Sequence, residues 1–247
     1  MGLRIIYTSI LLITLSGFLI GCEIDILLEE NFEDDVAGEL PNRESVPDNA
    51  FYTFSGSGLE DIGLEVINDG LLDSTSLLLN NNRPPLEEVI PWNRPFIIFV
   101  SADFDWDEEG RIFMAWNGSI DSGQSDSYLD IYTRYFRIRL EDGKIYYRNL
   151  SGTFSELGPY TVNSPHTFLI TLDRITEEYS IEIFQRQSAS IIRSGPKPIR
   201  ATRSNPFTER RIDIGMNYRV KDGFDPNFST GSYEIDNVLI TKEKPEI

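Results

Sequence analysis

The chain has 247 residues, and its 40 aspartates and glutamates outnumber its 22 lysines and arginines, which gives a formal net charge of -18. A surface of this sign repels nucleic acid, and no basic stripe interrupts it, so we exclude nucleic-acid binding as a function. One cysteine and one histidine rule out an intramolecular disulfide and metal sites built from these two residue types.

The first segment, residues 1–21, is typical of a secretory signal peptide, because Arg4 precedes a long, largely apolar run. The run ends in Leu19-Ile20-Gly21-Cys22, which resembles the lipobox of bacterial lipoproteins. The resemblance implies that Cys22 is acylated and that the chain is cleaved before it, so the protein would be held in a lipid membrane by Cys22. By resemblance to known sorting rules, Glu23 in place of an aspartate favours the outer membrane. The alternative is an ordinary signal peptide with a chance cysteine.

Three carboxylates near Cys22 are similar to the strand motif of laminarinase-type glycoside hydrolases: Glu23, Asp25 and Glu29. In those enzymes the carboxylates share one face of a strand, and a retaining pair lies ~5 Å apart. Here the third carboxylate comes one residue too late, and the motif would lie at the membrane, before the first strand. We therefore predict no catalytic residue here, and we assign residues 22–28 to a lipidated N-terminus with a short tether.

From about residue 50 onward, apolar residues alternate with polar ones, and glycine, asparagine, aspartate and proline separate the segments. This pattern is typical of antiparallel strands, clearest at residues 96–104, 112–116, 168–172 and 179–183. Asp142-Gly143 predicts a two-residue hairpin, and a shift in the apolar phase before it predicts a bulge near Tyr135. We expect one all-β domain over residues 29–247, built as a sandwich or barrel.

Three segments resemble parts of the concanavalin A-like (LamG-like) lectin/glucanase domains, in the order of that family. They are "ENFEDDVAGELPN" (30–42), "VNSPHTFLITLDRITEEYSIEIF" (162–184) and "YEIDNVLITK" (233–242), which are similar to its first strand and loop, a hairpin and its closing strand. The resemblance implies an all-β, two-sheet antiparallel jelly-roll sandwich whose closing strand lies near the first. It also implies that sugars often bind on the concave face and that a structural calcium ion is sometimes present.

Two sets of acidic residues are candidate ligands of Ca²⁺. By the resemblance, Glu33 or Asp34 near the first strand would share an ion with Asp236 in the last, although Asp236 could simply end or bend its strand. Independently, alternation would place Asp103, Asp105 and Asp107 in one row of carboxylates, and Ca²⁺ prefers oxygen ligands. The same row could instead be an acid–base set in a cleft or a solvent-facing strand edge.

Large aromatic residues are more numerous than one core face requires. In "YLDIYTRYF", the side chains of Tyr128, Asp130, Tyr132 and Arg134 face away from the apolar residues between them. Sugars stack their C–H faces on aromatic rings while polar groups fix the hydroxyls, so we predict that this row and Trp116 bind a glycan. The alternative is ordinary aromatic and charge pairing across an exposed sheet face.

The single histidine, His166, follows Pro165 at the start of a predicted strand, and we interpret it as structural. Our interpretation is a membrane-anchored bacterial envelope lipoprotein of the outer membrane that binds a polysaccharide without catalysis. One alternative is a divergent glycoside hydrolase or polysaccharide lyase of the same fold, using the carboxylates of residues 103–107. The other is a protein-binding envelope assembly factor.

Overall fold

The structure is a computed structural model that describes residues 26–39, 41, 50–54, 64–80, 96–101, 110–121, 127–132, 135–199, 212–220 and 232–246. These residues form fifteen strands in two sheets. Within these ranges, no helix is long and apolar enough to cross a membrane. Sheet A contains β1 (Ile26–Glu30), β3 (Leu64–Ile67), β4 (Ser76–Asn80), β6 (Arg111–Asp121), β11 (His166–Asp173), β12 (Glu178–Gln185), β13 (Ser190–Pro198) and β15 (Ser232–Thr241). Sheet B contains β2 (Ala50–Phe54), β5 (Phe96–Ser101), β7 (Ser127–Tyr132), β8 (Arg137–Glu141), β9 (Lys144–Arg148), β10 (Phe154–Pro159) and β14 (Ile212–Val220).

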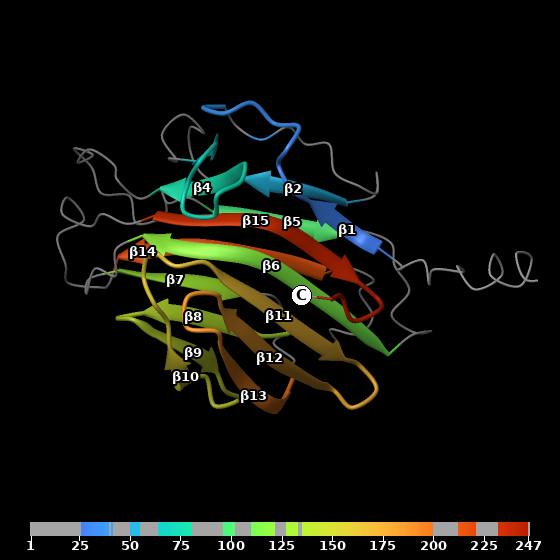
Figure 1. Ribbon diagram of the computed structural model, residues 1–247. Coiled ribbons are helices and arrows are strands. Elements are labelled where there is room, and N and C mark those ends of the chain that lie inside the picture. The colour runs from blue at the N-terminus through green and yellow to red at the C-terminus, as the bar shows by residue number, and fades with distance from the viewer. Residues whose placement is uncertain are drawn as a thin grey trace, which may run out of the picture.

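The two sheets form a β-sandwich, which confirms the predicted fold class (Figure 1). Sheet A runs in the order β13-β12-β11-β6-β15-β4-β3, with β1 also paired to β15, and sheet B runs β10-β9-β8-β7-β14-β5-β2. All of these pairs are antiparallel. The edges of the two sheets meet at β10 and β13, where a Cβ at Gly158 would lie 3.2 Å from Ile192 Cδ1.

Alternating side chains build the core between the sheets. On β12, Tyr179, Ile181 and Ile183 are buried, and their register partners on β11 are also apolar and buried. Sheet B contributes Leu129 and Ile131, both 0% exposed. Burying such a side chain contributes roughly 1.5–3 kcal/mol, so the period-two pattern largely determines which face of each strand turns inward.

The hairpin predicted at Asp142-Gly143 is confirmed. Both residues have positive φ, 52° and 71°, as a two-residue turn between twisted strands requires, and they join β8 to β9. The bulge predicted near Tyr135 is wrong. The chain reverses there between β7 and β8, whose residues Tyr132 and Arg137 are paired, and this reversal produces the shift in apolar phase.

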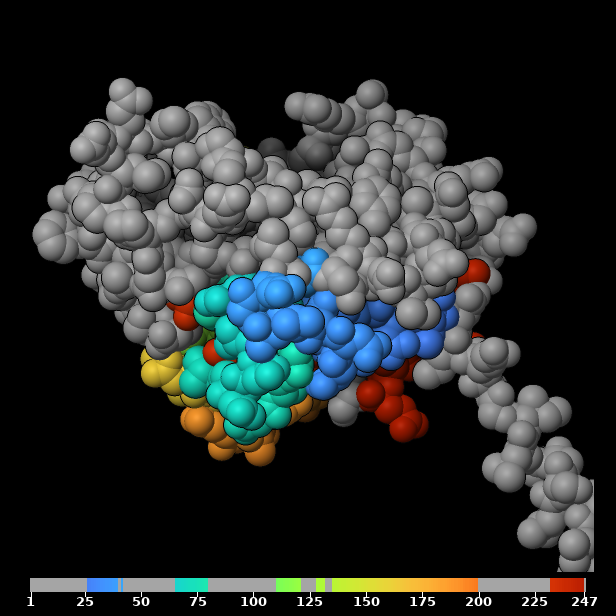
Figure 2. Space-filling model, turned by 90° about the horizontal axis from the view of Figure 1, so that it is seen from above, coloured from blue at the N-terminus to red at the C-terminus, as the bar shows by residue number. Residues whose placement is uncertain are grey.

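The first and last strands are paired, as the sequence predicts: Leu28 lies opposite Ile240. β1 begins at Ile26, which lies inside the segment expected to be a tether, so the sandwich begins earlier in the chain than residue 29. Residues 26–39 then lie beside residues 64–80, where Gly38 and Glu39 exchange backbone hydrogen bonds with Val66 (Figure 2, blue and teal).

Candidate functional site

The row predicted to bind sugar lies on the outer face of sheet B. Leu129 and Ile131 point into the core, so the alternating residues Tyr128 and Asp130 of β7 point outward. Their register partners on β8 are Glu141 and Arg139. The side chain of Tyr132 and the whole of Arg134 lie outside the described residues.

Asp130 is not available to a ligand, because two arginines enclose it. It is 0% exposed and accepts hydrogen bonds from Arg139 Nε at 2.9 Å and Nη2 at 3.1 Å, and also one from Arg137. The Arg139 guanidinium lies 3.8 Å from the ring centroid of Tyr128 and 4.2 Å from that of Phe154. The prediction that Asp130 binds sugar hydroxyls is therefore wrong. Tyr128 and Asp130 instead form the cross-strand aromatic and charge pairs that were the alternative.

The prediction that Trp116 binds sugar is also wrong, because its side chain is buried. It is 1% exposed, its ring stacks on Phe168 at 4.9 Å with an interplanar angle of 5°, and its Nε1 donates to Tyr233 Oη at 3.1 Å. The reason is its phase on β6, because Met114 and Trp116 both face the core.

The acidic residues predicted to bind calcium are only partly described. Asp34 is exposed, whereas Asp236 is 1% exposed and burial raises its pKa, although a hydrogen bond from Ser74 Oγ at 2.7 Å opposes this. Asp236 also accepts hydrogen bonds from Asn237 N and Nδ2, each at 2.6 Å. Over the described ranges, no three His, Cys, Asp or Glu side chains gather as a metal site. Residues Asp103, Asp105 and Asp107 lie outside those ranges, as does Cys22, so calcium stays a prediction.

A pocket of about 410 Å³ opens instead on the outer face of sheet A. Its lining comes from β6, β11, β12 and β15, from the residue after β12, and from the segment after β15. The lining residues are Ala115, Trp116, Asn117, Thr167, Phe184, Arg186, Asn237, Leu239, Pro245 and Glu246. The volume is in the range of small-molecule sites, which is about 300–1,000 Å³.

The segment after β15 folds back over sheet A and forms one wall of the pocket. Figure 1 shows this segment turning back to the point marked C, in front of the sheet. Lys244 Nζ forms an ion pair with Glu182 Oε1 at 2.8 Å, Arg193 binds the other oxygen of Glu182 at 3.1 Å, and Pro245 is buried. These contacts place the segment against sheet A, directly before Glu246.

A β-bulge brings Asn237 into the pocket lining. The register of β15 with β6 shifts between Asp236 and Leu239, so Asn237 and Val238 together lie opposite Trp116. Asn237 has φ of 51°, in the left-handed region that asparagine tolerates better than most residues. Asp236 stabilises the bulge by accepting both hydrogen bonds from Asn237.

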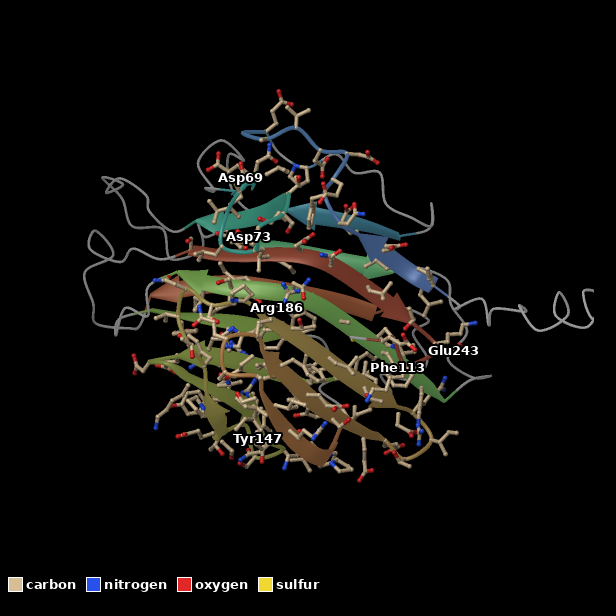
Figure 3. The ribbon with its side chains drawn as sticks, viewed as in Figure 1. Asp69, Asp73, Phe113, Tyr147, Arg186 and Glu243 are labelled. Carbon is tan, nitrogen blue, oxygen red and sulfur yellow. The ribbon has the colours of Figure 1, made fainter. Side chains whose placement is uncertain are left out.

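The pocket contains polar groups that have no hydrogen-bond partner within the described part of the chain. Asn117 Oδ1 accepts a hydrogen bond from Thr167 Oγ1 at 2.7 Å, which leaves Asn117 Nδ2 as a donor toward a ligand. Asn237 Oδ1, the Glu246 carboxylate and the Arg186 guanidinium have no such partner either. Figure 3 shows Arg186 over the face of sheet A that is turned to the viewer.

Sequence reasoning missed these residues because they come from distant parts of the chain. Asn117 alternates with Trp116, so its outward phase was readable, but the pair Asn117-Gly118 looks like a turn signal. Arg186 directly follows β12, and Glu246 follows β15 in a segment without periodicity. Only their arrangement in space brings them together.

No protein-family model and no curated protein sequence matches the chain, so the concanavalin A-like resemblance stays a prediction. Among solved structures, the chain is similar to the binding domain of botulinum neurotoxin serotype C1, with a TM-score of 0.54 and 10% identity. It is also similar to a structure of botulinum neurotoxin type C, with a TM-score of 0.52 and 13% identity. The description of that structure states that cell entry of the toxin depends on interaction with two ganglioside molecules. A third is the DC neurotoxin binding domain in complex with SialylT (TM-score 0.51, 11% identity).

Each of these matches covers 90% of this chain but only 48–49% of the toxin domain. The chain therefore spans about half the length of the structures that it resembles. At these identities the likeness shows the β-sandwich fold and does not locate a ligand in the shared half.

Proposed function

We propose that the protein is a non-catalytic glycan-binding protein and that its site is the pocket on the outer face of sheet A. The observation that carries this proposal is the combination of an apolar floor with unpartnered polar groups in one pocket of about 410 Å³. Sites for small ligands are mostly apolar and carry a few polar groups that fix orientation.

A sugar ring matches this combination. Its C–H face would lie on Phe184 and Leu239, and its hydroxyls would bind Asn117 Nδ2, Asn237 Oδ1 and Glu246. The similarity to toxin binding domains whose descriptions name gangliosides and SialylT gives this ligand class further support, at the level of fold.

The pocket lining argues against catalysis at this position. Glu246 is its single carboxylate among the described residues, whereas glycoside hydrolysis normally uses two carboxyl groups, ~5–10 Å apart. The hydrolase alternative would require residues 103–107, which lie outside the described ranges.

A glycan array followed by titration calorimetry with the purified protein tests the proposal. We expect Asn117→Ala and Phe184→Ala each to weaken glycan binding about tenfold, because each removes a pocket contact. Phe154→Ala, on the outer face of sheet B, is the matched control and should bind normally. Binding that is lost in the Phe154 variant but kept in both pocket variants would move the site to sheet B. A protein that binds no glycan at all would remove the proposed function.

We also propose that the protein is an envelope lipoprotein anchored by acylation of Cys22, because the residues before it resemble a lipobox. Expression in a bacterial host with radiolabelled palmitate should label the protein and place it in the membrane fraction. The Cys22→Ser variant should lose both the label and the membrane association. Unlabelled wild-type protein would contradict the anchor and leave the pocket proposal intact.

A further inference from the structure

Arg186 differs from the other cationic residues of the protein. Among the lysines and arginines whose side chains the structure describes, each of the others has a hydrogen bond, an ion pair, a ring contact or another close interaction. Arg186 is exposed, and among the described residues its side chain is attracted to Asp236 but forms no ion pair. In a chain with a formal charge of -18, an arginine that pairs with none of the described carboxylates is unexpected.

Asp236 attracts Arg186 but forms no ion pair with its guanidinium. Asp236 is 1% exposed, and its oxygens already accept hydrogen bonds from Ser74 and Asn237. Arg186 lines the pocket, and no hydrogen bond or ion pair within the described part of the chain occupies its guanidinium, so its N–H groups are available to a ligand. An arginine presents paired donors in a planar fork, which matches the two oxygens of a carboxylate.

We infer that the pocket binds a carboxylated sugar residue and that Arg186 binds its carboxylate. This inference rests on the proposed function, since it names the ligand class of the same pocket. Glu246 lines the pocket but forms no ion pair with Arg186. The Glu246 carboxylate accepts hydrogen bonds from hydroxyl groups and repels negative charge. We therefore expect the ligand to carry a single carboxylate per bound ring, on the side of Arg186.

The neutral parts of the pocket favour a sugar over a free amino acid, which could also pair with one arginine and one glutamate. Asn117 Nδ2 and Asn237 Oδ1 supply one donor and one acceptor, which suits neighbouring hydroxyls. Phe184 and Leu239 supply an apolar surface on which the C–H face of a ring can lie.

Titration calorimetry of the purified protein with matched disaccharides tests the inference. The probes are disaccharides ending in glucuronate, galacturonate or mannuronate, sialyllactose, and the neutral counterpart of each. We expect at least one acidic sugar to bind about tenfold more tightly than its counterpart, because a bidentate pair adds about this much. Arg186→Gln should abolish the preference while leaving the weak binding of the neutral sugar. Arg111→Gln, an exposed arginine outside the pocket lining, is the control and should keep the preference.

Three results would overturn the inference, and they differ in what they say about the proposed function. Neutral sugars that bind as tightly as acidic ones would remove the carboxylate preference but keep glycan binding. A preference that survives Arg186→Gln would assign the carboxylate to another residue. Binding of glycine or another free amino acid in place of every sugar would remove both the inference and the proposed function. Circular dichroism of each variant checks that it is folded.

Discussion

Glu30 is a carboxylate in an unfavourable place. It is 8% exposed, its Oε1 accepts a hydrogen bond from Phe32 N at 3.0 Å, and its Oε2 has no partner among the described residues. Burial raises its pKa to about 7, the Phe32 hydrogen bond opposes the shift, and the charge of Asp35 adds to it. The folded protein therefore keeps a proton near pH 6 that the unfolded chain, with its ordinary glutamate pKa, has released.

This shift predicts that Glu30 makes the fold less stable as pH rises. The contribution of Glu30 to the free energy of unfolding should fall between about pH 4.5 and 7, because this side chain holds its proton in the folded state and has released it in the unfolded state over that range. Glu30→Gln should be more stable than wild type by about 2–3 kcal/mol at pH 8 and nearly equal to it at pH 4. Urea unfolding at the two pH values measures this, and an equal difference at both would contradict the raised pKa.

His166 is predicted to have the opposite pH dependence. Its ring is 4% exposed, and Nδ1 donates to Ser164 O at 2.7 Å, so the neutral ring carries its proton on Nδ1. Burial lowers its pKa, which the hydrogen bond to Ser164 opposes. Its contribution to stability is therefore present above about pH 6.5 and is lost as pH falls toward the lower folded-state pKa.

His166→Asn can keep a donor toward Ser164 O and removes the titration. The stability difference between wild type and this variant should change in favour of the variant from pH 7 to pH 5. Urea unfolding at both values gives the difference, in which the contribution of Glu30 cancels. A difference that does not change with pH would show that His166 titrates normally in the folded protein.

At the scale of elements, the close approach of β6 and β15 depends on Gly118. A Cβ at this position would lie 2.0 Å from Tyr233 Oη, the atom that accepts the hydrogen bond from Trp116. Gly118→Ala should therefore destabilise the fold by about 1–3 kcal/mol, because the buried Tyr233 ring must move. Gly195→Ala on β13 is the matched control, since nothing lies within 4 Å of its added Cβ, and its stability should be nearly unchanged. Equal unfolding free energies for the two variants would contradict this packing.

Strands and turns were predicted best from the sequence, because the alternation of apolar and polar residues is a local pattern. The phases of residues 168–172 and 179–183 and the turn at Asp142-Gly143 all follow from neighbours in the chain. The same reasoning failed for Trp116, because the count of aromatic residues drew it into a sugar site although its phase on β6 already placed it beside Met114. It also failed for Asp130, since the two arginines that enclose it, Arg137 and Arg139, come from the next strand.

The candidate site could not be predicted for a different reason. Its polar groups come from β6, from the residue after β12, from a bulge in β15 and from the segment after β15. None of these positions has a local signal for binding. The bulge at Asn237 depends on hydrogen bonds to Asp236, and no periodic pattern contains that information.

At the scale of the whole molecule, the formal charge of -18 predicts a response to salt. Repulsion between like charges destabilises the compact state, and the Debye length falls from about 30 Å at 0.01 M salt to about 8 Å at 0.15 M. Most of the described ion pairs are at least partly exposed and contribute little, so screening them costs little. The melting temperature should therefore rise by a few degrees between 0.01 M and 0.3 M sodium chloride. Scanning calorimetry measures it, and a constant or falling value would contradict the prediction.

The folded-back segment after β15 has a practical consequence for anyone who handles this protein. Pro245 and Glu246 line the pocket, so a purification tag or fluorescent fusion joined behind them begins at the mouth of the candidate site. A hexahistidine tag there would bring a flexible, cationic peptide next to Glu246 at mildly acidic pH, and it would compete with the assay ligand. Binding measurements should use a tag that is removed, or one placed before β1.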